Sequence, residues 1–557
     1  MGHGQSHRHP EEDSRVVNTK YGQILGRRFT FDKRQVDAFQ GVPYAKPPIG
    51  SLRFRAIDPI MLQKPEPPEP WENVRETKKF APRSIQKDMF IIEKTLGGYS
   101  QSEDCLYLNV FAPVWSPQSS TGFAVLVFIH GGGFVSDSTV KYGDVGICEH
   151  LCTKEVIVVT VQYRVGYLGF FSTGDEHCYG NFALWDQTLA LKWIQDNISF
   201  FNGDPTNVTV MGQSAGGASV DLLSICPHSR DLFHRVIPMA GNASCEWAIQ
   251  RSIVEECRKF AEKNGVKDCI HSEKMIDALR DIPASNFALS LFDKSTTSGE
   301  PRCRVGPRID GDFIPKCISD LRKEAPSKPM LIGCCSSEGL ILLEGKPSVS
   351  ALMDKIALII PEDRYPLSFK ALRDDLLNKL ITNPDDHFAV ARGNVEILSD
   401  VFTNIGVQQT VIETLQENKG PVYFYSFDYF NPKSWGLLSM RWPFKDATHC
   451  TELAYIFAVG IVSSFEFNDE DRRMLELTTR MWTNFAKYGN PNGIRDDVNS
   501  SLRPFCDENF SWEPTTLSNP QKHLSLKLNP EMHEKFRNGR PLLIVQMRNE
   551  KAEKKQM

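Results

Sequence analysis

A serine between two glycines is the first residue whose setting suggests chemistry. The stretch VTVMGQSAGGASV, residues 208–220, fits the pattern G-x-S-x-G around Ser214. The β-branched run before it predicts a strand, and the small and aliphatic residues after it predict a helix. On a tight turn between a strand and a helix, a serine is held at unfavourable backbone angles with its hydroxyl presented to a substrate. Ser214 is therefore a candidate nucleophile, and the alternative is a serine in an ordinary glycine-rich loop.

Three consecutive glycines can supply the donors that such a nucleophile needs. The stretch FIHGGGF follows another β run and ends at Phe134. The N–H groups of Gly132 and Gly133, with that of Ala215 directly after the serine, can hold a developing oxyanion. Each preorganised donor of this kind contributes about 2.7–4 kcal/mol to transition-state stabilisation. We expect His130 to be structural, and the alternative for the glycines is a plain turn.

An acid and a base follow in the chain order that this arrangement requires, which is serine, acid and then histidine. Glu338 comes shortly after a β run in PMLIGCCSSEGL, and the alternative for it is an exposed surface carboxylate. His449, in DATHCTELAYIF, lies in a long loop after a further β run. The loops after parallel strands meet at the carboxyl edge of a sheet. We therefore expect Ser214, Glu338 and His449 to meet there as nucleophile, acid and base.

The elements that must position these residues are short runs of β-branched and aromatic residues, which predict fully buried strands. These runs are residues 125–130, 156–163, 208–211, 330–334 and 422–427. Between them lie helical patterns, of which 181–198 and 472–490 carry an apolar face. Strands that alternate with helices predict a mostly parallel central sheet with helices on both faces. We expect one α/β domain over residues 14–547, between a flexible tail of residues 1–13 and a charged tail of residues 548–557.

The bulk composition excludes several classes of function. The net charge of −5 over 557 residues gives no basic surface for nucleic acid. No apolar run approaches the roughly 20 residues of a transmembrane helix. The fourteen cysteines include no C-x-x-C pair, which argues against a zinc site and against thioredoxin chemistry. We expect reduced thiols, no metal and no cofactor.

The N-terminal segment bears on where the chain works. It contains no apolar core of a secretory signal, so we expect a cytoplasmic protein that is not secreted. Gly2 and Ser6 fit the pattern M-G-x-x-x-[ST] for N-myristoylation. A single myristoyl chain would give only weak association with a membrane surface. The alternative is an unmodified, solvated tail.

Longer motifs resemble those of the type B carboxylesterase family, which includes the cholinesterases. Among them are FQGVPYAKPPIGSLRF (residues 39–54), EDCLYLNVFAP (residues 103–113) and NFAKYGNPNG, and the resemblance covers about residues 16–541. It implies an α/β-hydrolase fold with large loop and helix insertions, and carboxylic ester hydrolysis without a metal or cofactor. It also implies the same triad and oxyanion hole as the residues above, and a structural ion pair between Arg53 and Glu103.

Several positions depart from the pattern of that family. Ser84 stands where a cysteine usually pairs with Cys105, and Ala278 stands at the end of a second family disulfide. The loss of both favours a reducing compartment. The residue before the nucleophile is Gln213 instead of the common glutamate, and Ala240 replaces a serine. Because neighbouring groups orient a triad, these two changes bear on the catalytic rate.

The substrate class follows from the same residues. Segment 85–102 contains no tryptophan, so a choline ester would lack its cation–π partner. We expect hydrolysis of small to medium carboxylic esters through an acyl-enzyme on Ser214, with a small-molecule ester as the partner. The sequence carries no signal for an oligomeric state. Two alternatives stay open: a non-catalytic adhesion module on the same fold, and a sequestering esterase that acylates quickly but turns over slowly.

Overall fold

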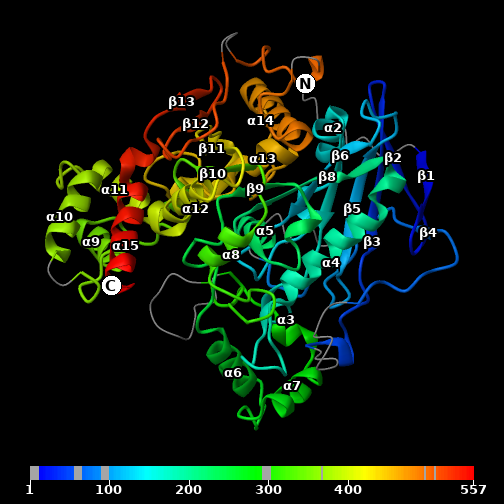
Figure 1. The fold of residues 1–557 in the computed structure, drawn as a ribbon, viewed down its shortest axis with the longest axis horizontal. Coiled ribbons are helices and arrows are strands. Elements are labelled where there is room, and N and C mark those ends of the chain that lie inside the picture. The colour runs from blue at the N-terminus through cyan, green and yellow to red at the C-terminus, as the bar shows by residue number, and fades with distance from the viewer. Residues whose placement is uncertain are drawn as a thin grey trace.

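A sheet of thirteen strands runs through the centre of the computed structural model (Figure 1). The structure describes residues 12–54, 66–88, 100–291, 303–365, 368–494, 497–506 and 510–556. Within these ranges the strands are β1 (Glu12–Thr19), β2 (Gly22–Phe31), β3 (Arg34–Pro43), β4 (Arg75–Glu76), β5 (Tyr107–Pro113), β6 (Phe123–Ile129), β7 (Val156–Val161), β8 (Gly203–Gln213), β9 (Arg235–Met239), β10 (Met330–Cys335), β11 (Val422–Phe427), β12 (His523–Leu526) and β13 (Glu531–His533).

The middle of the sheet is parallel and its two edges are antiparallel. The strands follow the order β1-β2-β3-β5-β7-β6-β8-β9-β10-β11-β12-β13, and β4 pairs with β2. From β7 to β12 all neighbouring strands run parallel. The pairs from β1 to β7 and the pair of β12 with β13 are antiparallel. The mostly parallel sheet that the sequence predicts is therefore confirmed, and its carboxyl edge spans β6, β8, β10 and β11.

Helices cover both faces of the sheet. One core joins the sheet to α4, α5 and α12, and the other joins it to α2, α13 and α14. Within the described ranges the helices are α2 (Val145–His150), α3 (Gly166–Phe170), α4 (Phe182–Asn197), α5 (Ala215–Ile225), α6 (Ile253–Lys263), α7 (Ser272–Arg280), α8 (Ile318–Glu324), α9 (Val349–Ile359), α10 (Phe369–Leu380), α11 (His387–Ser399), α12 (Ile405–Gln416), α13 (Thr451–Phe457), α14 (Asp469–Tyr488) and α15 (Arg540–Gln556).

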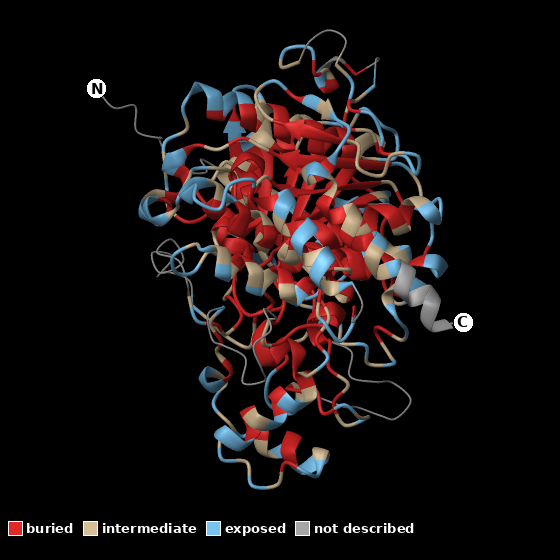
Figure 2. Ribbon diagram, turned by 90° about the vertical axis from the view of Figure 1, so that its left-hand side faces the viewer, coloured by how far each residue is buried: buried red, intermediate tan, exposed pale blue. Residues whose placement is uncertain are grey.

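The central strands are buried on both faces, which explains their continuous apolar sequences. In β6, Val125 and Val127 face the core that contains α4 and α5. Leu126 and Phe128 alternate with them and face the core that contains α14. Figure 2 shows the buried residues concentrated in the sheet and in the helices against it, with the exposed residues around them.

The predicted elements are present, with some differences at their ends. β8 begins at Gly203, before the β-branched run, because this earlier segment pairs with the start of β6. Gly489, directly after α14, has a left-handed conformation, as a helix C-cap requires. β1 begins at Glu12, and α15 continues as far as Gln556. Regular structure therefore extends into both segments that we expected to be tails.

A smaller group of helices lies beside the sheet. Helices α9, α10, α11 and α15 share a hydrophobic cluster of their own, which includes Leu352, Ile356 and Ile544. Figure 1 shows these helices together at one side of the molecule. Across the described ranges, no helix is both long enough and apolar enough to span a bilayer.

The ion pair that the family resemblance implies is formed. Nε and Nη2 of Arg53 lie 2.6 and 2.5 Å from the two carboxylate oxygens of Glu103. Nη1 of Arg53 also donates to the carbonyl oxygens of Leu279 and Ile282, at the end of α7. One guanidinium thus fastens the start of the EDCL segment to a helix far away in the sequence.

Candidate active site

Ser214 occupies a sharp turn between β8 and α5. Its φ is +59° and its ψ is −124°, a backbone conformation that costs free energy for any residue with a Cβ atom. The N–H of Ser214 donates to the carbonyl oxygen of Met239 over 2.8 Å. The turn also needs glycines nearby: a Cβ on Gly216 would lie 2.1 Å from the carbonyl oxygen of Ile129, and one on Gly241 would lie 2.1 Å from that of Ser214. The predicted strand-to-helix turn is therefore formed, and its neighbours hold the serine in a strained conformation.

Three side chains from distant parts of the sequence meet at this turn. Nε2 of His449 lies 2.8 Å from Oγ of Ser214, and Nδ1 of His449 lies 2.5 Å from Oε2 of Glu338. The serine and the histidine are each 7% exposed, and the glutamate is fully buried. With Nδ1 carrying the proton, the imidazole donates to the carboxylate and accepts from the hydroxyl. The result is a continuous chain of hydrogen bonds from a buried carboxylate to a serine hydroxyl.

Glu338 is held by the turn that follows β10. The N–H of Cys335 donates to Oε1 of Glu338 over 2.6 Å, so both carboxylate oxygens have partners. The next residue, Gly339, donates its N–H to Oγ of Ser399 over 2.8 Å. A Cβ on Gly339 would lie 2.6 Å from Cβ of Leu398, so the turn approaches α11 closely. These contacts fix the carboxylate in the orientation that faces His449.

His449 comes from the loop between β11 and α13. The N–H of Ser337 donates to the carbonyl oxygen of Ala447 over 2.8 Å, which fastens this loop to the turn that carries Glu338. The ring of Phe402 meets the imidazole edge to face, with 4.9 Å between the ring centroids. The imidazole is thus held from two sides, by a carboxylate at its edge and by an aromatic ring.

The surroundings of His449 favour its protonated form. Burial by itself lowers the pKa of His449, because the imidazolium loses its hydration. Cys450 and Glu338 outweigh burial and raise the pKa of His449 well above its ordinary value of 6.5. Of the two, Glu338 contacts the imidazole directly, with its Oε2 2.5 Å from Nδ1 of His449. The site therefore favours the imidazolium form of His449 over its neutral form.

The glycine loop lies directly beside Ser214. A Cβ on Gly131 would lie 3.1 Å from Cβ of Ser214. Gly132 and Gly133 have φ of +90° and +60°, which is the left-handed region that glycine adopts without strain. In the part of the chain that the structure describes, the N–H groups of Gly132, Gly133 and Ala215 donate to no other protein group. Three amide donors predicted from the sequence are thus left without protein partners next to the serine.

Apolar side chains border the site. A Cβ on Gly133 would lie 2.1 Å from Cδ1 of Leu291, so this leucine covers one side of the glycine loop. Phe402 stacks on Trp247 with ring centroids 5.7 Å apart, and it contacts His449 with its own ring. These walls favour an uncharged group next to the serine.

Gln213 and Cys450 form a second contact to the imidazole. Nε2 of Gln213 lies 3.5 Å from Nδ1 and 3.4 Å from Nε2 of His449. Sγ of Cys450 donates to Oε1 of Gln213 over 3.2 Å, which turns the amide nitrogen towards the ring. Cys450 has a φ of +74°, a conformation that favours glycine. Gln213 is among the positions predicted from the sequence to affect the site, and Cys450 is not, although its position next to His449 is a usable signal.

A second buried carboxylate, which was not predicted from the sequence, lies behind the site. Sγ of Cys335 donates to Oε2 of Glu452 over 2.8 Å. Burial, and next the charge of Glu338, raise the pKa of Glu452 to about 7. Glu452 lies on the first turn of α13, three residues after His449. That spacing was the only signal in the sequence, and it does not by itself predict burial.

His130 lies in a structural contact. Its ring stacks on Tyr163, with 4.3 Å between the centroids, and Tyr163 donates its hydroxyl to the carbonyl oxygen of His130. Burial lowers the pKa of His130. The expected structural place of this histidine agrees with these contacts.

Some predicted features lie outside the described residues. These are the lipidation candidate Gly2 and most of segment 85–102, where a cholinesterase would carry its tryptophan. Among the residues that are described, no group of three or more His, Cys, Asp and Glu side chains is suited to hold a metal ion.

Comparison with known proteins identifies the family. The model of the carboxylesterase family matches residues 13–543. The chain belongs to the carboxylesterase family. The mixed, mostly parallel sheet of this carboxylesterase is that of the α/β-hydrolase fold.

Named relatives of this carboxylesterase are esterases and a hydrolase. It is 38% identical over 553 residues to esterase cest-33 of Caenorhabditis elegans, covering 97% of this chain and 95% of that protein. It is 33% identical over 520 residues to juvenile hormone esterase of Tribolium castaneum, covering 86% and 84%. It is 32% identical over 518 residues to a medium-chain fatty acyl-CoA hydrolase precursor of Anas platyrhynchos, covering 88% and 86%. The carboxylesterase is therefore a carboxylic ester hydrolase, which sets aside the adhesion module.

Proposed function

We propose that Ser214 is the nucleophile of this ester hydrolase, with His449 as its general base and Glu338 as the acid that orients the base. The proposal is supported by the chain of two hydrogen bonds through His449: its Nε2 lies 2.8 Å from Oγ of Ser214, and its Nδ1 lies 2.5 Å from Oε2 of Glu338. This chain of hydrogen bonds is the observation on which the proposal depends. Further support comes from the strained backbone of Ser214, which is typical of a nucleophile on a strand-to-helix turn.

The first half-reaction forms an acyl-enzyme. Oγ of Ser214 attacks the ester carbonyl carbon while Nε2 of His449 takes the hydroxyl proton. The N–H groups next to the serine, those of Gly132, Gly133 and Ala215, hold the negative oxygen of the tetrahedral intermediate. When this intermediate collapses, the bond to the alcohol oxygen breaks and His449 gives that oxygen its proton.

The second half-reaction releases the acid. His449 takes a proton from water as the water oxygen attacks the acyl carbon. A second tetrahedral intermediate forms in the same oxyanion hole. It collapses by breaking the bond to Oγ of Ser214, which recovers the proton from His449. Glu338 remains ionised throughout and stabilises the imidazolium in both halves.

The substrates that we propose are small to medium uncharged carboxylic esters. Apolar walls around Leu291 and Phe402 support this, because they would leave a charged group without partners. The absence of tryptophan from segment 85–102 argues against choline esters. The name of one relative, a fatty acyl-CoA hydrolase, extends the candidates to thioesters.

A series of p-nitrophenyl esters of rising acyl length tests the assignment. We expect Ser214→Ala to lose at least about a thousandfold in kcat on every ester, since the nucleophile is gone. Ser224→Ala is the matched control, because Ser224 is a buried serine on α5, the helix that follows Ser214. Equal turnover by Ser214→Ala and the native chain would refute the assignment.

Slow deacylation is a second candidate behaviour, and Gln213 favours it. The amide of Gln213 lies within 3.5 Å of both imidazole nitrogens, where the family usually places a carboxylate. An amide cannot stabilise the imidazolium of the second half-reaction as a carboxylate would. Rapid-mixing kinetics separate the two: a sequestering esterase gives a stoichiometric burst of p-nitrophenol and then a near-stop, and an efficient hydrolase continues.

We further propose that the protein works in the cytoplasm, with a lipid on Gly2 as a weak membrane anchor. Buried free thiols support a reducing compartment, and Cys105 faces Ser84 where the family has a disulfide. The lipid is supported only by the sequence pattern at Gly2 and Ser6. Intact-mass analysis of the N-terminal peptide from a eukaryotic host tests it, and an acetylated or free terminus would contradict it.

A further inference from the structure

A loop with large exposed apolar side chains lies between β11 and His449. We call residues 432–445 the basic loop. Its Leu437 and Met440 are 79% and 74% exposed, and Leu438 is 42% exposed. Exposed apolar side chains that occur singly need no explanation, but three within four residues mark an interaction site.

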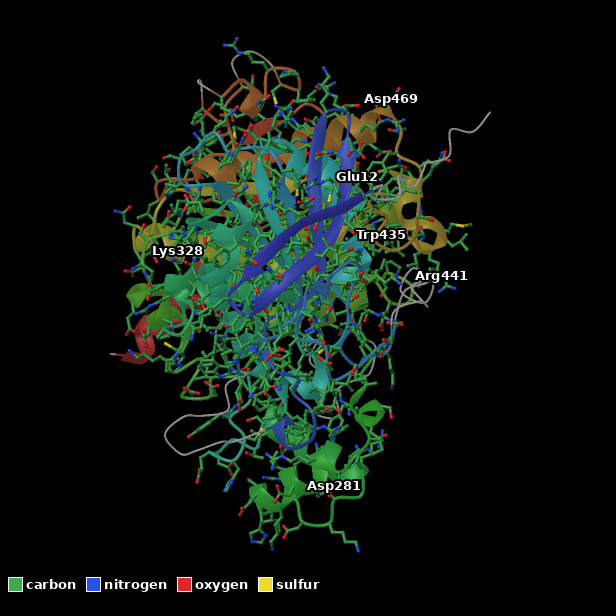
Figure 3. The ribbon with its side chains drawn as sticks, turned by 90° about the vertical axis from the view of Figure 1, so that its right-hand side faces the viewer. Glu12, Asp281, Lys328, Trp435, Arg441 and Asp469 are labelled. Atoms are coloured by element: carbon green, nitrogen blue, oxygen red, sulfur yellow. The ribbon has the colours of Figure 1, made fainter. Side chains whose placement is uncertain are left out.

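The inner side of the basic loop is firmly attached to the fold. Nε1 of the buried Trp435 donates to Oγ1 of Thr451, the first residue of α13, over 3.2 Å. Within the loop, the ring of Trp435 packs against that of Trp442, with 5.2 Å between the centroids. The side chain of Asn431 accepts a hydrogen bond from the backbone at the start of the loop. Figure 3 shows Trp435 nearer the body of the molecule and Arg441 towards its outer edge. The apolar side chains are thus held outward by an anchored scaffold.

The basic loop carries positive charge only. Lys433, Arg441 and Lys445 lie within it, and it contains no acidic residue. All three are exposed, and among the described residues none forms an ion pair with a carboxylate. The next acidic residue, Asp446, turns inward and accepts hydrogen bonds from the hydroxyl groups of Ser336 and Ser337. The loop itself therefore carries three cations around three apolar side chains, in a chain with a net charge of −5.

We propose that the basic loop docks the protein on the surface of an anionic phospholipid bilayer. Leucine and methionine side chains would enter the boundary between headgroups and acyl chains, and the basic residues would contact the anionic headgroups. Interfaces between proteins are instead depleted in lysine at their centres, and here two of the three cations are lysines. Charge and composition together favour a lipid surface over a protein partner.

Docking through this loop would bring the active site close to the bilayer. The basic loop ends four residues before His449, in the same connection between β11 and α13. Esters of low solubility accumulate at such a surface, so docking would concentrate uncharged substrates at the site. The docking itself does not depend on Ser214, so its test is independent of the test of the proposed triad.

Vesicle co-sedimentation of the full chain tests the proposal. The protein is made in bacteria, which do not myristoylate Gly2, and is mixed with vesicles of phosphatidylcholine alone or with about one third phosphatidylserine. We expect binding to the anionic vesicles to be at least about tenfold tighter, since each basic residue near such a surface contributes about fivefold. Leu437→Ser/Met440→Ser should lose about tenfold or more, and Arg441→Gln/Lys445→Gln about 25-fold on the anionic vesicles.

The control is Ile270→Ser, because Ile270 is 85% exposed and lies on the connection between α6 and α7. We expect this variant to bind vesicles like the native chain, and all variants to keep the native activity on a soluble ester. Native affinity for anionic vesicles in both double variants would overturn the proposal. A native chain that binds neither kind of vesicle would overturn it as well. If that chain proved to be a dimer, and Leu437→Ser/Met440→Ser were monomeric, the loop would be an interface between copies.

Discussion

In the proposed reaction Glu338 acts on the substrate only through His449, so its contribution should appear in the pH dependence of the rate. In the native protein, burial by itself lowers the pKa of His449, but Cys450 and Glu338 outweigh this effect and hold the pKa well above 6.5. Histidine accepts the serine proton only when neutral, so kcat/KM should rise with pH through that pKa.

Glu338→Gln removes the negative charge, which should move this rise in kcat/KM to lower pH. The plateau should fall by about 10³–10⁴-fold, because the imidazolium loses its partner and its tautomer is no longer fixed. A pH–rate profile of both proteins on one ester measures this, and a rise that stays at the same pH or moves to higher pH would contradict it.

Cys450 is expected to act as a positioning residue for the imidazole. Its thiol holds the amide of Gln213 over 3.2 Å, and the amide nitrogen lies near both nitrogens of His449. Cys450→Ala should lower kcat by about fivefold with little change in KM, which corresponds to one neutral hydrogen bond. Cys450→Ser keeps a donor at this position and should recover most of the rate. If both variants show the native kcat, the contact has no part in the reaction.

The strand-to-helix element that carries Ser214 depends on the close approach of two turns. A Cβ on Gly241 would lie 2.1 Å from the carbonyl oxygen of Ser214, and backbone there cannot move without shifting the serine. Gly241→Ala should therefore lower the free energy of unfolding by about 1–3 kcal/mol and remove most of the activity.

Gly265→Ala is the matched control, since a Cβ at Gly265 meets nothing within 4 Å. Its φ of +84° should cost some stability but no activity. Thermal unfolding and ester turnover of the two variants measure the difference, and native activity in Gly241→Ala would contradict the expectation.

At the level of elements, the sequence predicts best where burial dictates residue type. The run at β11 is predicted to the residue, because a strand buried on both faces needs continuous apolar side chains. The start of β8 is not predicted, because Pro205 and Asn207 are disfavoured in strands and pairing with β6 decides the outcome. The three residues of the proposed triad could be singled out from the sequence because each lies in a segment that follows a buried strand. Phe402 and Leu291 are not, because they come from insertions whose packing no local pattern specifies.

Stability of the whole molecule should depend on pH through Glu452. Its pKa is about 7 in the folded protein and about 4.5 as an ordinary carboxyl, so the folded state binds more protons between these values. The stability that this group contributes is therefore complete below pH 4.5 and is lost as the pH rises through 7. In Glu452→Gln that loss should be absent. The free energy of unfolding of the native protein minus that of Glu452→Gln should therefore fall by up to about 3 kcal/mol as the pH rises over this range. Denaturant titrations at several pH values measure it, and a difference that is flat or rises with pH would contradict the assignment.

The most direct test of the proposed reaction is made on the whole enzyme and asks whether Oγ of Ser214 becomes acylated. The native chain and Ser214→Ala are mixed with a p-nitrophenyl ester, quenched in acid during the first turnovers and digested for peptide mass spectrometry. We predict the mass of the acyl group on the peptide that contains Ser214 in the native chain, and no acylated peptide in the variant. An acyl group on another residue, or ester turnover in the native chain without any acyl-enzyme while Ser214→Ala remains equally active, would contradict the account.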